Sequence, residues 1–360
     1  MKRKRVALYN PFLDTLGGGE RYILSIMKAL SEFDYESTIF WDENLTTAIE
    51  KRLHLTFQRL TFAPNIFKHH SVIKILTTLK DYDLFLYVTD GSYFASSAKK
   101  NIIYTMIPDK MLYKKNLINN LKLYNYRFIS HSYFTQQILK KWGIQSEVLY
   151  PYLDDTFLNI NIQTIKKEKI ILSVGRFFKH LHTKRHDLMI KSFKSLRTAL
   201  PQLKEYTLVL AGGFKHEDKE YMAELQTLIA NDSSIIVKTN VGYDELVKLY
   251  KKASIYWHFA GYGIDDTAQP ELVEHLGISP LEAMAAGCIT MCYRAGGPKE
   301  LIQDGENGFL FKSIEELESK MSTVLKDESI HHTIQTAAQF YTKNHFNYSI
   351  FKARVSELFL

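Results

Sequence analysis

The second half of the chain contains a short run of cations with the chemistry of a phosphate site. Gly175-Arg176 ends an apolar run, and Lys179 and Lys184 follow before the helix predicted at Asp187–Leu196. A guanidinium and an ammonium delivered by the end of a strand suit a diphosphate, which needs two or more cations to offset its charge. A solvated basic loop is the alternative interpretation of this run.

A second cluster begins at Glu274. Ser279, Pro280 and Glu282 have the types expected at the N-cap, first and third positions of a helix, which would give Glu282 a structural role in a capping box. Gly277-Ile278-Ser279 also brings bare backbone amides to that helix N-terminus, which suits an anion. Glu274 precedes the helix in a predicted loop where no packing role is evident, so it is a candidate for chemistry.

In the first half, Gly17-Gly18-Gly19 precedes a helix predicted over Glu20–Leu30. Three glycines let backbone amides approach an anion at the positive end of the helix dipole. A flexible turn is the alternative. The run does not match the dinucleotide pattern G-x-G-x-x-G, because Tyr22 stands where the third glycine belongs.

No set of residues predicts a metal site. Cys288 and Cys292 share one face of a strand that is expected to be buried, and two cysteines alone give no zinc set and fit a reducing compartment. His182 and His186 enclose two cations that would repel a metal ion. Asp81-Tyr82-Asp83 resembles a D-x-D motif but more simply leads into a strand.

Length and composition favour two α/β domains. The chain has 360 residues, of which 46% are hydrophobic and 24% charged, so it can bury two cores. Apolar runs alternate with amphipathic stretches, which predicts parallel sheets covered by helices on both faces. A further short strand is expected after the turn Asp304–Gly308. The predicted strands are Val6–Asn10, Ser37–Trp41, Leu84–Thr89, Asn101–Ile107 and Arg127–Ser132, then Lys169–Gly175, Thr207–Gly212, Ile235–Val241, Ser254–Phe259 and Cys288–Tyr293.

The predicted linker lies at Leu149-Tyr150-Pro151, where an apolar run ends at a proline and a polar stretch follows. We therefore expect an N-terminal domain over residues 1–152 and a C-terminal domain over residues 153–340. A final helix within residues 341–360, centred on Tyr348–Phe359, is expected to pack back on the first domain. Ligands of such sheets bind at the carboxyl ends of the strands.

The net charge of +7 is unevenly distributed. Residues 1–150 hold 21 Lys and Arg against 13 Asp and Glu, which gives +8, whereas residues 151–360 hold 25 against 26. A basic half favours a polyanionic partner such as an anionic membrane face, a phosphorylated lipid or nucleic acid; a soluble surface is the alternative. No apolar run approaches the roughly 20 residues of a membrane span, and no signal-peptide core follows Met1–Arg5, so we expect a cytoplasmic protein.

Together these clusters resemble the GT-B retaining glycosyltransferases of family 4, over Ser173–Phe193 and Asn240–Gly308. The family's E-x7-E frame stands here as Glu274-x7-Glu282. Gly17-Gly18-Gly19-Glu20 and Ser130–Thr135 look like the family's first glycine loop and interdomain segment. The stretch from Glu274 to Ile278 is similar to GDP-mannose-using lipid-linked-oligosaccharide mannosyltransferases and to some bacterial envelope glycosyltransferases. The resemblance implies two Rossmann-like domains facing across a cleft.

The resemblance also implies roles for individual residues. Arg176 and Lys184 would hold the donor diphosphate and stabilise the charge of the leaving nucleotide. These two cations are eight residues apart where the family usually has about five, so Lys179 is an alternative; Lys184 is preferred because the residues after it continue in the family's register. The family needs no metal or other cofactor.

Further site residues follow from the same resemblance. Glu274 would contact the hydroxyls of the donor sugar, and Glu282 would accept hydrogen bonds from the ribose. Backbone amides of Gly277–Ser279 would meet the sugar and phosphate. Gly18 and Gly19 would approach the phosphates from the first domain.

One departure concerns the acceptor side. Many relatives carry a histidine two residues before a proline after the fourth strand, and here that position, ahead of Pro108, is Met106. Any acceptor-side role then falls elsewhere, with Asp109 and Asp90 as candidates.

The sequence therefore predicts a retaining hexosyltransferase that uses a nucleotide-sugar, with GDP-mannose favoured and a UDP- or dTDP-sugar possible. The acceptor would be a cell-surface glycan or lipid-linked oligosaccharide, met at the inner face of a membrane. One alternative is an NAD(P) oxidoreductase with Asp42 on the ribose. Another is a non-catalytic binder of a nucleotide-sugar or of nucleic acid, although scattered cations and the lack of an RNA motif argue against nucleic acid. Donor base, sugar, acceptor and oligomeric state stay open.

Overall fold

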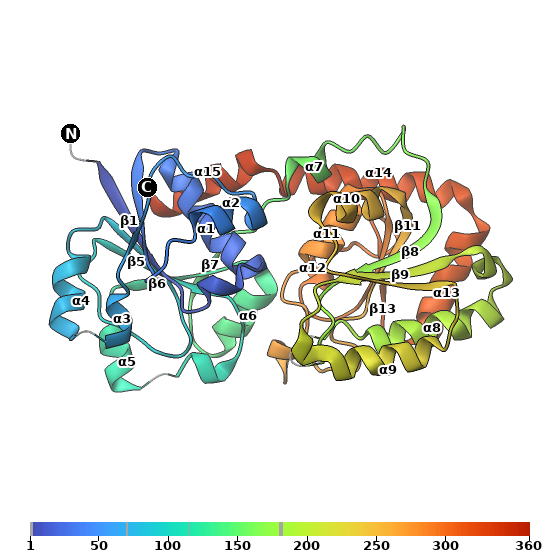
Figure 1. Ribbon diagram of the computed structural model, residues 1–360, viewed down its shortest axis with the longest axis horizontal. Helices are drawn as coiled ribbons and strands as arrows, with labels where there is room; N and C mark the ends of the chain where they lie inside the picture. Colours follow the sequence, from blue (N-terminus) through green and yellow to red (C-terminus); the bar gives the residue numbers. More distant parts are fainter. Residues whose placement is uncertain (1–2, 70, 115, 180–182) are drawn as a thin grey trace. The chain divides into compact units, whose positions relative to one another are not determined.

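A computed structural model describes residues 3–69, 71–114, 116–179 and 183–360 (Figure 1). The chain divides into two compact units. Unit 1 comprises Met1–Pro151 and Ser349–Leu360, and unit 2 comprises Tyr152–Tyr348.

Unit 1 is built on a seven-stranded sheet in the order β3-β2-β1-β4-β5-β6-β7, and every neighbouring pair is parallel. Two strands were not expected from the sequence, β3 and β7. Both are short, half-exposed edge strands without a clear hydrophobic alternation, so the pattern that identifies a buried strand is absent. The strands are β1 (Lys4–Tyr9), β2 (Tyr35–Phe40), β3 (Leu60–Ala63), β4 (Leu84–Val88), β5 (Lys100–Thr105), β6 (Tyr126–Ser130) and β7 (Ser146–Val148).

The helices of unit 1 connect consecutive strands, and the last one returns from the end of the chain. Lys352 of that helix pairs with Glu32 at 2.7 Å, and Lys100 donates to the carbonyl of Phe359 at 2.8 Å. The described helices are η1 (Leu13–Thr15), α1 (Gly18–Ser31), α2 (Thr46–Leu53), α3 (Ile66–His69), α4 (Val72–Leu79), η2 (Lys110–Leu112), α5 (Leu117–Lys122), α6 (Tyr133–Lys141) and α15 (Tyr348–Phe359).

Unit 2 contains a six-stranded parallel sheet in the order β10-β9-β8-β11-β12-β13. The strands are β8 (Glu168–Val174), β9 (Thr207–Gly212), β10 (Ile235–Thr239), β11 (Ala253–His258), β12 (Ile289–Tyr293) and β13 (Phe309–Phe311). The two predicted Rossmann-like parallel sheets are thus confirmed.

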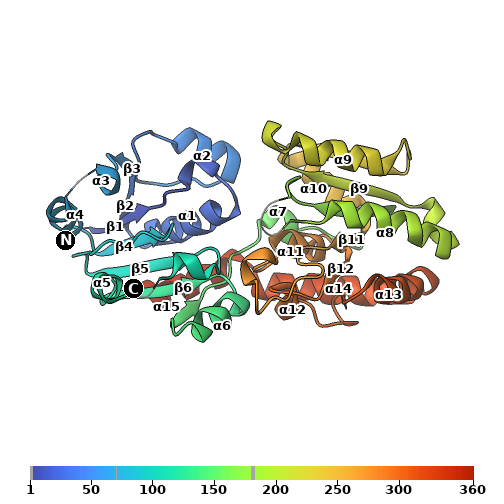
Figure 2. The same cartoon turned by 90° about the horizontal axis from the view of Figure 1, so that it is seen from below.

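Figure 1 shows α8 and α9 on one side of this sheet and α10, α11 and α14 on the other, and Figure 2 gives the view from below. The sequence places the return to unit 1 at residue 341, but that residue lies within α14, which belongs to unit 2; the chain re-enters unit 1 at Ser349. The helices are α7 (Asp155–Leu158), α8 (His186–Ala199), η3 (Pro201–Glu205), η4 (His216–Asp218), α9 (Lys219–Ile229), α10 (Tyr243–Lys252), η5 (Pro270–Leu272), α11 (Ile278–Ala285), α12 (Pro298–Leu301), α13 (Ile314–Lys326) and α14 (Glu328–His345).

Both sheets reverse their strand order once, and in open α/β sheets such a switch point forms a crevice at the carboxyl ends of the two strands. In unit 2 the reversal falls between β8 and β11, and in unit 1 between β1 and β4. Chain connections leave in opposite directions at such a point, so ligands of open α/β sheets bind there. The loops after β8 and β11 carry the cations and Glu274 of the sequence analysis.

The crevice of unit 2 depends on close approach of two loops. A Cβ added to Gly212, at the end of β9, would lie 1.7 Å from the carbonyl oxygen of Gly175, whereas one added to the neighbouring Gly213 would lie 3.5 Å from Cγ of Arg176. The first distance is a severe clash and the second an ordinary contact.

We therefore expect Gly212→Ala to lower the free energy of unfolding by about 1–3 kcal/mol, because backbone must move to admit the methyl group. Gly213→Ala is the matched control and should change it by less than about 1 kcal/mol. Denaturant titration of both variants measures the difference; equal stabilities would contradict the described approach.

Candidate functional site

Three side chains meet at the carboxyl ends of β8 and β11. Lys184 forms an ion pair with Oε2 of Glu274, and Nε2 of His258 lies 3.0 Å from the same oxygen. The Lys184 and Glu274 side chains are only 12% and 16% exposed, and that of His258 is fully buried. The structure thus brings together two of the predicted residues, which are 90 positions apart in the chain.

Glycine allows Lys184 to reach this position. A Cβ at Gly175 would lie 2.4 Å from Cγ of Lys184, so the lysine stem crosses the end of β8 where a side chain would stand. Lys179, the alternative cation, instead pairs with Glu224 of α9 at 2.6 Å, and both of those side chains are about half exposed. The geometry therefore places Lys184, and not Lys179, beside Glu274.

The loop that carries Glu274 is held by its backbone. Gly297 donates to the carbonyl of Glu274 at 2.8 Å, and a Cβ at Gly296 would lie 2.1 Å from that carbonyl oxygen. Asp266 accepts from the amide of Gly296 at 2.7 Å and pairs with Lys299 at 2.5 Å. These contacts fix the glycine turn after β12 against the Glu274 loop, because neither glycine has a side chain to keep the two backbones apart.

Burial and charge act in opposite directions on the Glu274 carboxyl. Desolvation by burial raises its pKa, but the Lys184 ammonium and the hydrogen bond from His258 hold it well below the ordinary value. Burial lowers the pKa of His258, outweighing the hydrogen bond to Glu274. A neutral ring that faces a carboxylate with Nε2 carries its proton there, so His258 donates to Glu274.

Arg176 follows Gly175 directly after the end of β8. Its side chain is exposed, its guanidinium lies 4.5 Å from the ring centroid of Phe178, and it forms no ion pair with any residue in the described ranges. A guanidinium stacked on one ring keeps its in-plane N–H donors available, which suits a phosphate oxygen.

The N-terminus of α11 differs from its sequence prediction. Gly277, with a φ of +109°, is the N-cap and Ile278 begins the helix, so Ser279 is not the N-cap and the predicted capping box with Glu282 is wrong. The left-handed turn at the glycine starts the helix two residues earlier than Ser279 would. The amides of Ile278 and Ser279 precede the first bond within the helix, made by Leu281 to Gly277 at 3.2 Å. Two amides thus face out at the positive end of α11.

Glu282 lies on the first turns of α11 and is half-buried. Its Oε2 accepts from the hydroxyl of Tyr250 at 2.9 Å. Tyr250 also donates to the carbonyl of Ser279 at 3.3 Å, which orients the carboxylate relative to the helix terminus.

The predicted glycines of the first half lie in unit 1, at the start of α1. A Cβ at Gly19 would lie 2.1 Å from the sulfur of Met106, while nothing lies within 4 Å of one at Gly18. Packing therefore explains why residue 19 is glycine, because the thioether of Met106 lies where a Cβ would stand. Gly18 borders open space. The acceptor-side candidates each use an oxygen in their own turn: Asp90 accepts from Ser92 and Asp109 from Met111.

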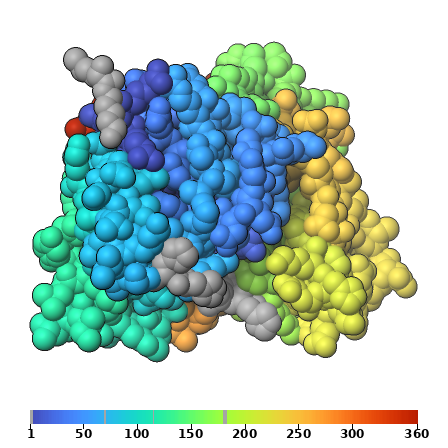
Figure 3. Space-filling model, turned by 60° about the vertical axis from the view of Figure 1, so that its left-hand side comes forward, coloured from blue at the N-terminus to red at the C-terminus, as the bar shows by residue number. Residues whose placement is uncertain are grey.

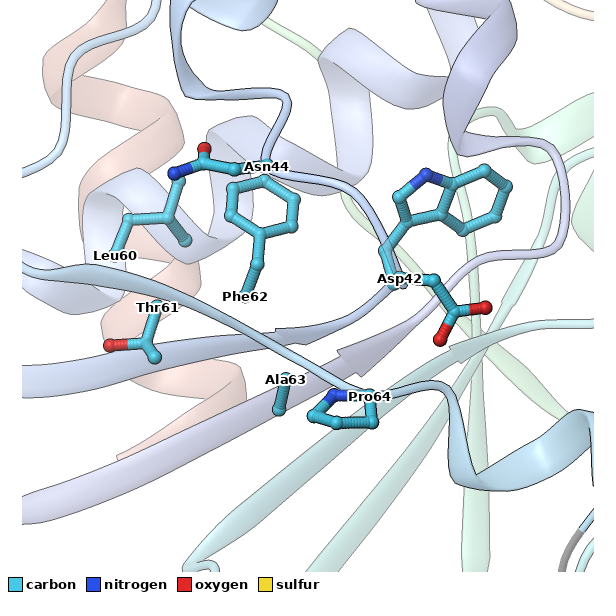
Figure 4. A pocket seen from close by; sticks show the side chains of 8 residues that line it. Asp42, Asn44, Leu60, Thr61, Phe62, Ala63 and Pro64 are labelled. Carbon is cyan, nitrogen blue, oxygen red and sulfur yellow. The ribbon is translucent and has the colours of Figure 1, made fainter.

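A separate hollow of about 410 Å³ lies in unit 1 beside β3, lined by Trp41, Asp42, Asn44 and residues 60–64 (Figure 4). Asp42, the ribose candidate of the oxidoreductase alternative, accepts from the amide of Asn65 at 2.8 Å and lies 3.6 Å from the ammonium of Lys68. Its carboxylate is therefore engaged in local structure.

The described residues contain no group of three or more His, Cys, Asp or Glu able to hold a metal ion. His182 of the H-x-x-x-H pair lies outside the described residues. Its partner His186 is fully buried against the ring of Phe177, with 4.6 Å between ring centroids.

Sequence reasoning missed His258 and Asp266. His258 is the polar end of an otherwise apolar strand, a signal that was present in the sequence. Asp266 lies in a loop with no motif in the sequence, and only the fold shows that its side chain is 12% exposed and tied to the turn after β12.

Comparison with known proteins places this site in a family. A family model described as "Glycosyl transferases group 1" matches residues 155–340, more than half of the chain. The GDP-Man:Man(3)GlcNAc(2)-PP-Dol alpha-1,2-mannosyltransferase of Xenopus tropicalis is 32% identical over 198 residues, which cover 52% of this chain and 38% of the relative. The chain thus spans about two fifths of the length of that relative. The alpha-1,3/1,6-mannosyltransferase ALG2 of Candida albicans is 26% identical over 381 residues, covering 84% of each chain.

Solved structures confirm the predicted GT-B fold. A glycosyltransferase from Rickettsia africae ESF-5 superposes with a TM-score of 0.76 at 15% identity, covering 99% of this chain and 98% of that one. Anabaena Alr3699/HepE, solved in complex with UDP, gives a TM-score of 0.72 at 18% identity and covers 99% of both chains.

Two lysines of the loop between β8 and α8 allow a matched test, because Lys184 forms a nearly buried ion pair with Glu274 and Lys179 an exposed one with Glu224. Glu274→Gln should lower the free energy of unfolding at neutral pH by about 3 kcal/mol, because it leaves the nearly buried Lys184 ammonium without its counter-charge. Glu224→Gln, which unpairs the exposed Lys179, should cost no more than about 1 kcal/mol. Denaturant titration compares the two; similar losses would show that Lys184 is not held as described.

The buried histidines predict acid destabilisation. Burial lowers the pKa of His186 to about 3 from an ordinary 6.5, so between these values the unfolded chain binds a proton that the folded chain does not. Stability then falls as pH decreases through this window, by up to about 1.4 kcal/mol per unit for each such histidine. Urea titrations between about pH 5 and pH 7 should show that the free energy of unfolding of His186→Leu falls less per pH unit than that of the wild type. Exposed His216→Leu is the control and should match the wild type; an unchanged slope in His186→Leu would contradict the assignment.

Proposed function

We propose, from the premise that the chain belongs to the glycosyl transferases group 1 family, that it transfers a hexose from a nucleotide-sugar with retention of configuration. GDP-mannose is the favoured donor, because matched relatives carry GDP-Man and mannosyltransferase in their names. A UDP-sugar or a dTDP-sugar is the alternative, and the UDP complex of HepE supports a UDP-sugar. The acceptor we propose is a cell-surface glycan or a lipid-linked oligosaccharide.

The observation that carries this proposal is the pairing of Lys184 with Glu274 at the carboxyl ends of β8 and β11. Arg176 follows the end of β8 and forms no ion pair among the described residues. In the proposed reaction, Arg176 and Lys184 hold the donor diphosphate. As the glycosidic bond breaks, negative charge grows on the leaving phosphate oxygen. Two fixed cations stabilise that charge, and no metal is needed.

Glu274 is proposed to contact the donor-sugar hydroxyls near the reacting carbon. Because the pKa of this carboxyl is held low, it is an anion at neutral pH and can accept hydrogen bonds from hydroxyls. His258 is a positioning residue in this scheme, since its Nε2–H directs one carboxylate oxygen. Glu282, whose carboxylate is oriented by Tyr250, would accept from the ribose hydroxyls, and amides of Gly277–Ser279 would meet the sugar and phosphate.

Unit 1 is proposed as the acceptor domain and unit 2 as the donor domain. Gly18, with open space beside it, is the better candidate for an approach to the phosphates, because Gly19 is covered by Met106. The position of the family histidine is thus filled by a thioether that cannot act as an acid or base. Asp109 or Asp90 remains the proposed acceptor-side group.

We further propose that the protein works at the cytoplasmic face of a membrane as a peripheral protein. Within the described ranges, no helix combines the length and hydropathy that a membrane span requires. Support for membrane contact comes from the excess of +8 in residues 1–150 and from the PP-Dol acceptor in the names of matched relatives.

Thermal stabilisation by nucleotides tests the donor site. GDP and GDP-mannose should stabilise the protein by about 2.7 kcal/mol at 100 times their dissociation constant. UDP, dTDP and ADP compounds at the same concentration should stabilise it less. Arg176→Ala should weaken binding about 10- to 100-fold, because charge-assisted hydrogen bonds to phosphate are lost. The control is Lys179→Ala, a cation of the same loop that faces Glu224 and should leave affinity unchanged.

Stabilisation by NAD(P)H alone, or by no nucleotide, would overturn the proposal. If a nucleotide-sugar binds, transfer to a lipid pyrophosphate-linked acceptor followed by NMR of the anomeric centre gives the stereochemistry. A product with inverted configuration would contradict retention.

A further inference from the structure

The helix α5 and its flanks present a surface that folding does not explain. Five large apolar side chains of this segment are 64–83% exposed: Met111, Leu117, Ile118, Leu121 and Tyr124. Together with the adjacent Lys110, Lys114 and Lys122 they are called the α5 surface here. Seven of the twelve exposed large apolar side chains among the described residues lie between Val72 and Tyr124, all in unit 1.

The fold itself makes no use of these apolar groups. No residue of α5 is buried, and the helix is held by local polar contacts: Asn116 caps it by accepting from the amide of Asn119 at 2.8 Å, and Asn119 donates back to the carbonyl of Lys114. The segment is joined to the core through Leu123. Exposed Leu and Ile contribute nothing to stability in water, so a contiguous set of them marks a surface that binds something else.

The charge around the α5 surface is of one sign. Residues 110–146 contain seven Lys or Arg and no Asp or Glu. Lys110 and Lys114 are exposed, and Lys122 is half-exposed at the end of α5. Asp109 is the nearest acidic residue in the sequence, and one of its carboxylate oxygens accepts a hydrogen bond from the amide of Met111. The apolar groups are therefore surrounded by cations that have no nearby acidic group in sequence.

The first turn of α4 adds to this surface. Val72 and Ile73 are 59% and 73% exposed, and the neighbouring Lys74 is exposed as well. Both ribbon views place α4 and α5 at the same end of unit 1, and Figure 3 shows cyan atoms of the α4 region adjoining the blue-green atoms that follow in the chain. Two separate helices thus present the same combination of aliphatic and ammonium groups.

We propose that unit 1 docks on an anionic lipid bilayer through the α5 surface, with α4 at its margin. The apolar side chains would enter the boundary between headgroups and acyl chains, Tyr124 would lie at headgroup level, and the lysines would extend to lipid phosphates. The inference rests on the proposed function for its purpose, because a lipid-linked acceptor is found at such a surface. Its evidence, the exposure and charge of one segment, is independent of the donor site.

The observations favour a bilayer over a protein partner or a second copy of the chain. A protein interface core is depleted of lysine, whereas the α5 surface intersperses Lys with Leu and Ile. A second copy would bring two clusters of like charge together, with no acid of this segment to offset them. An anionic leaflet attracts each lysine by about 1 kcal/mol and accepts the aliphatic groups at the same time.

Vesicle co-sedimentation tests the proposal. The full chain should bind phosphatidylcholine vesicles that contain about 30% phosphatidylglycerol, bind pure phosphatidylcholine poorly, and lose affinity as salt increases. A Leu117→Ser, Ile118→Ser, Leu121→Ser triple variant should bind at least about 10-fold more weakly, because the inserted apolar area is lost. Lys114→Glu with Lys122→Glu should show a similar loss. The matched control is Phe340→Ser with Ile236→Ser, which removes exposed apolar groups from unit 2 and should bind like the wild type.

A site-specific probe shows which groups enter the lipid. Cys288 and Cys292 are buried, so a Leu117→Cys variant can be labelled at one exposed position with an environment-sensitive fluorophore. Its emission should shift to the blue on anionic vesicles, whereas a label at Phe340→Cys should not respond.

Three results would overturn the proposal: equal binding to neutral vesicles, unchanged binding by the triple variant, or a dimer by light scattering that the triple variant abolishes without any vesicle binding. Thermal shift with GDP, measured on the same samples, separates this outcome from failure of the proposed function. A wild-type protein that binds nucleotide but not anionic vesicles rejects the docking surface alone, and a wild-type protein that binds no nucleotide rejects the proposed function.

Discussion

The Lys184–Glu274 ion pair is the interaction around which unit 2 is organised. Both charges are nearly buried, so neither would be stable there without the other, and His258 supplies a further hydrogen bond. Their position at the one reversal of strand order places the pair where two loops leave the sheet in opposite directions. A paired, desolvated ammonium is already fixed in place, so it needs little reorganisation to stabilise charge that develops on a leaving group.

That pair imposes a geometric constraint which glycines satisfy. The lysine stem lies where a Cβ of Gly175 would be, the end of β9 approaches the Gly175 carbonyl at Gly212, and the Glu274 carbonyl lies against Gly296. Each contact lets backbones approach more closely than side chains would permit. The glycines around the crevice thus serve two purposes, because the same absence of Cβ atoms that packs these loops also leaves backbone amides accessible to an anion.

The sequence predicts the parts of this arrangement that are local in the chain. Apolar runs identify buried strands such as β8 and β11. The E-x7-E spacing is local as well, because it lies within one loop and the helix that follows. What the sequence cannot supply is the set of contacts that topology creates: that Glu274 meets Lys184 and His258, or that Asp266 ties the turn after β12. The misplaced capping box has a local cause instead, since the left-handed Gly277 begins α11 before Ser279. The edge strands β3 and β7 were missed because half-exposed strands lack the alternation that reveals buried ones.

The two units distribute charge in opposite ways, and this difference agrees with the ligands proposed for each. Unit 2 is nearly neutral in sequence and keeps its reactive charges paired within a crevice, which suits a small ligand that is enclosed and released. Unit 1 carries its excess cations on an exposed surface next to aliphatic groups. An isolated exposed lysine gains little from any one partner. Several lysines gain together only from an extended anionic surface, and the exposed Leu and Ile beside them gain only if that surface has an apolar interior. A lipid bilayer meets both conditions, so the composition of α5 supports the proposed docking surface and fits the proposed lipid-linked acceptor.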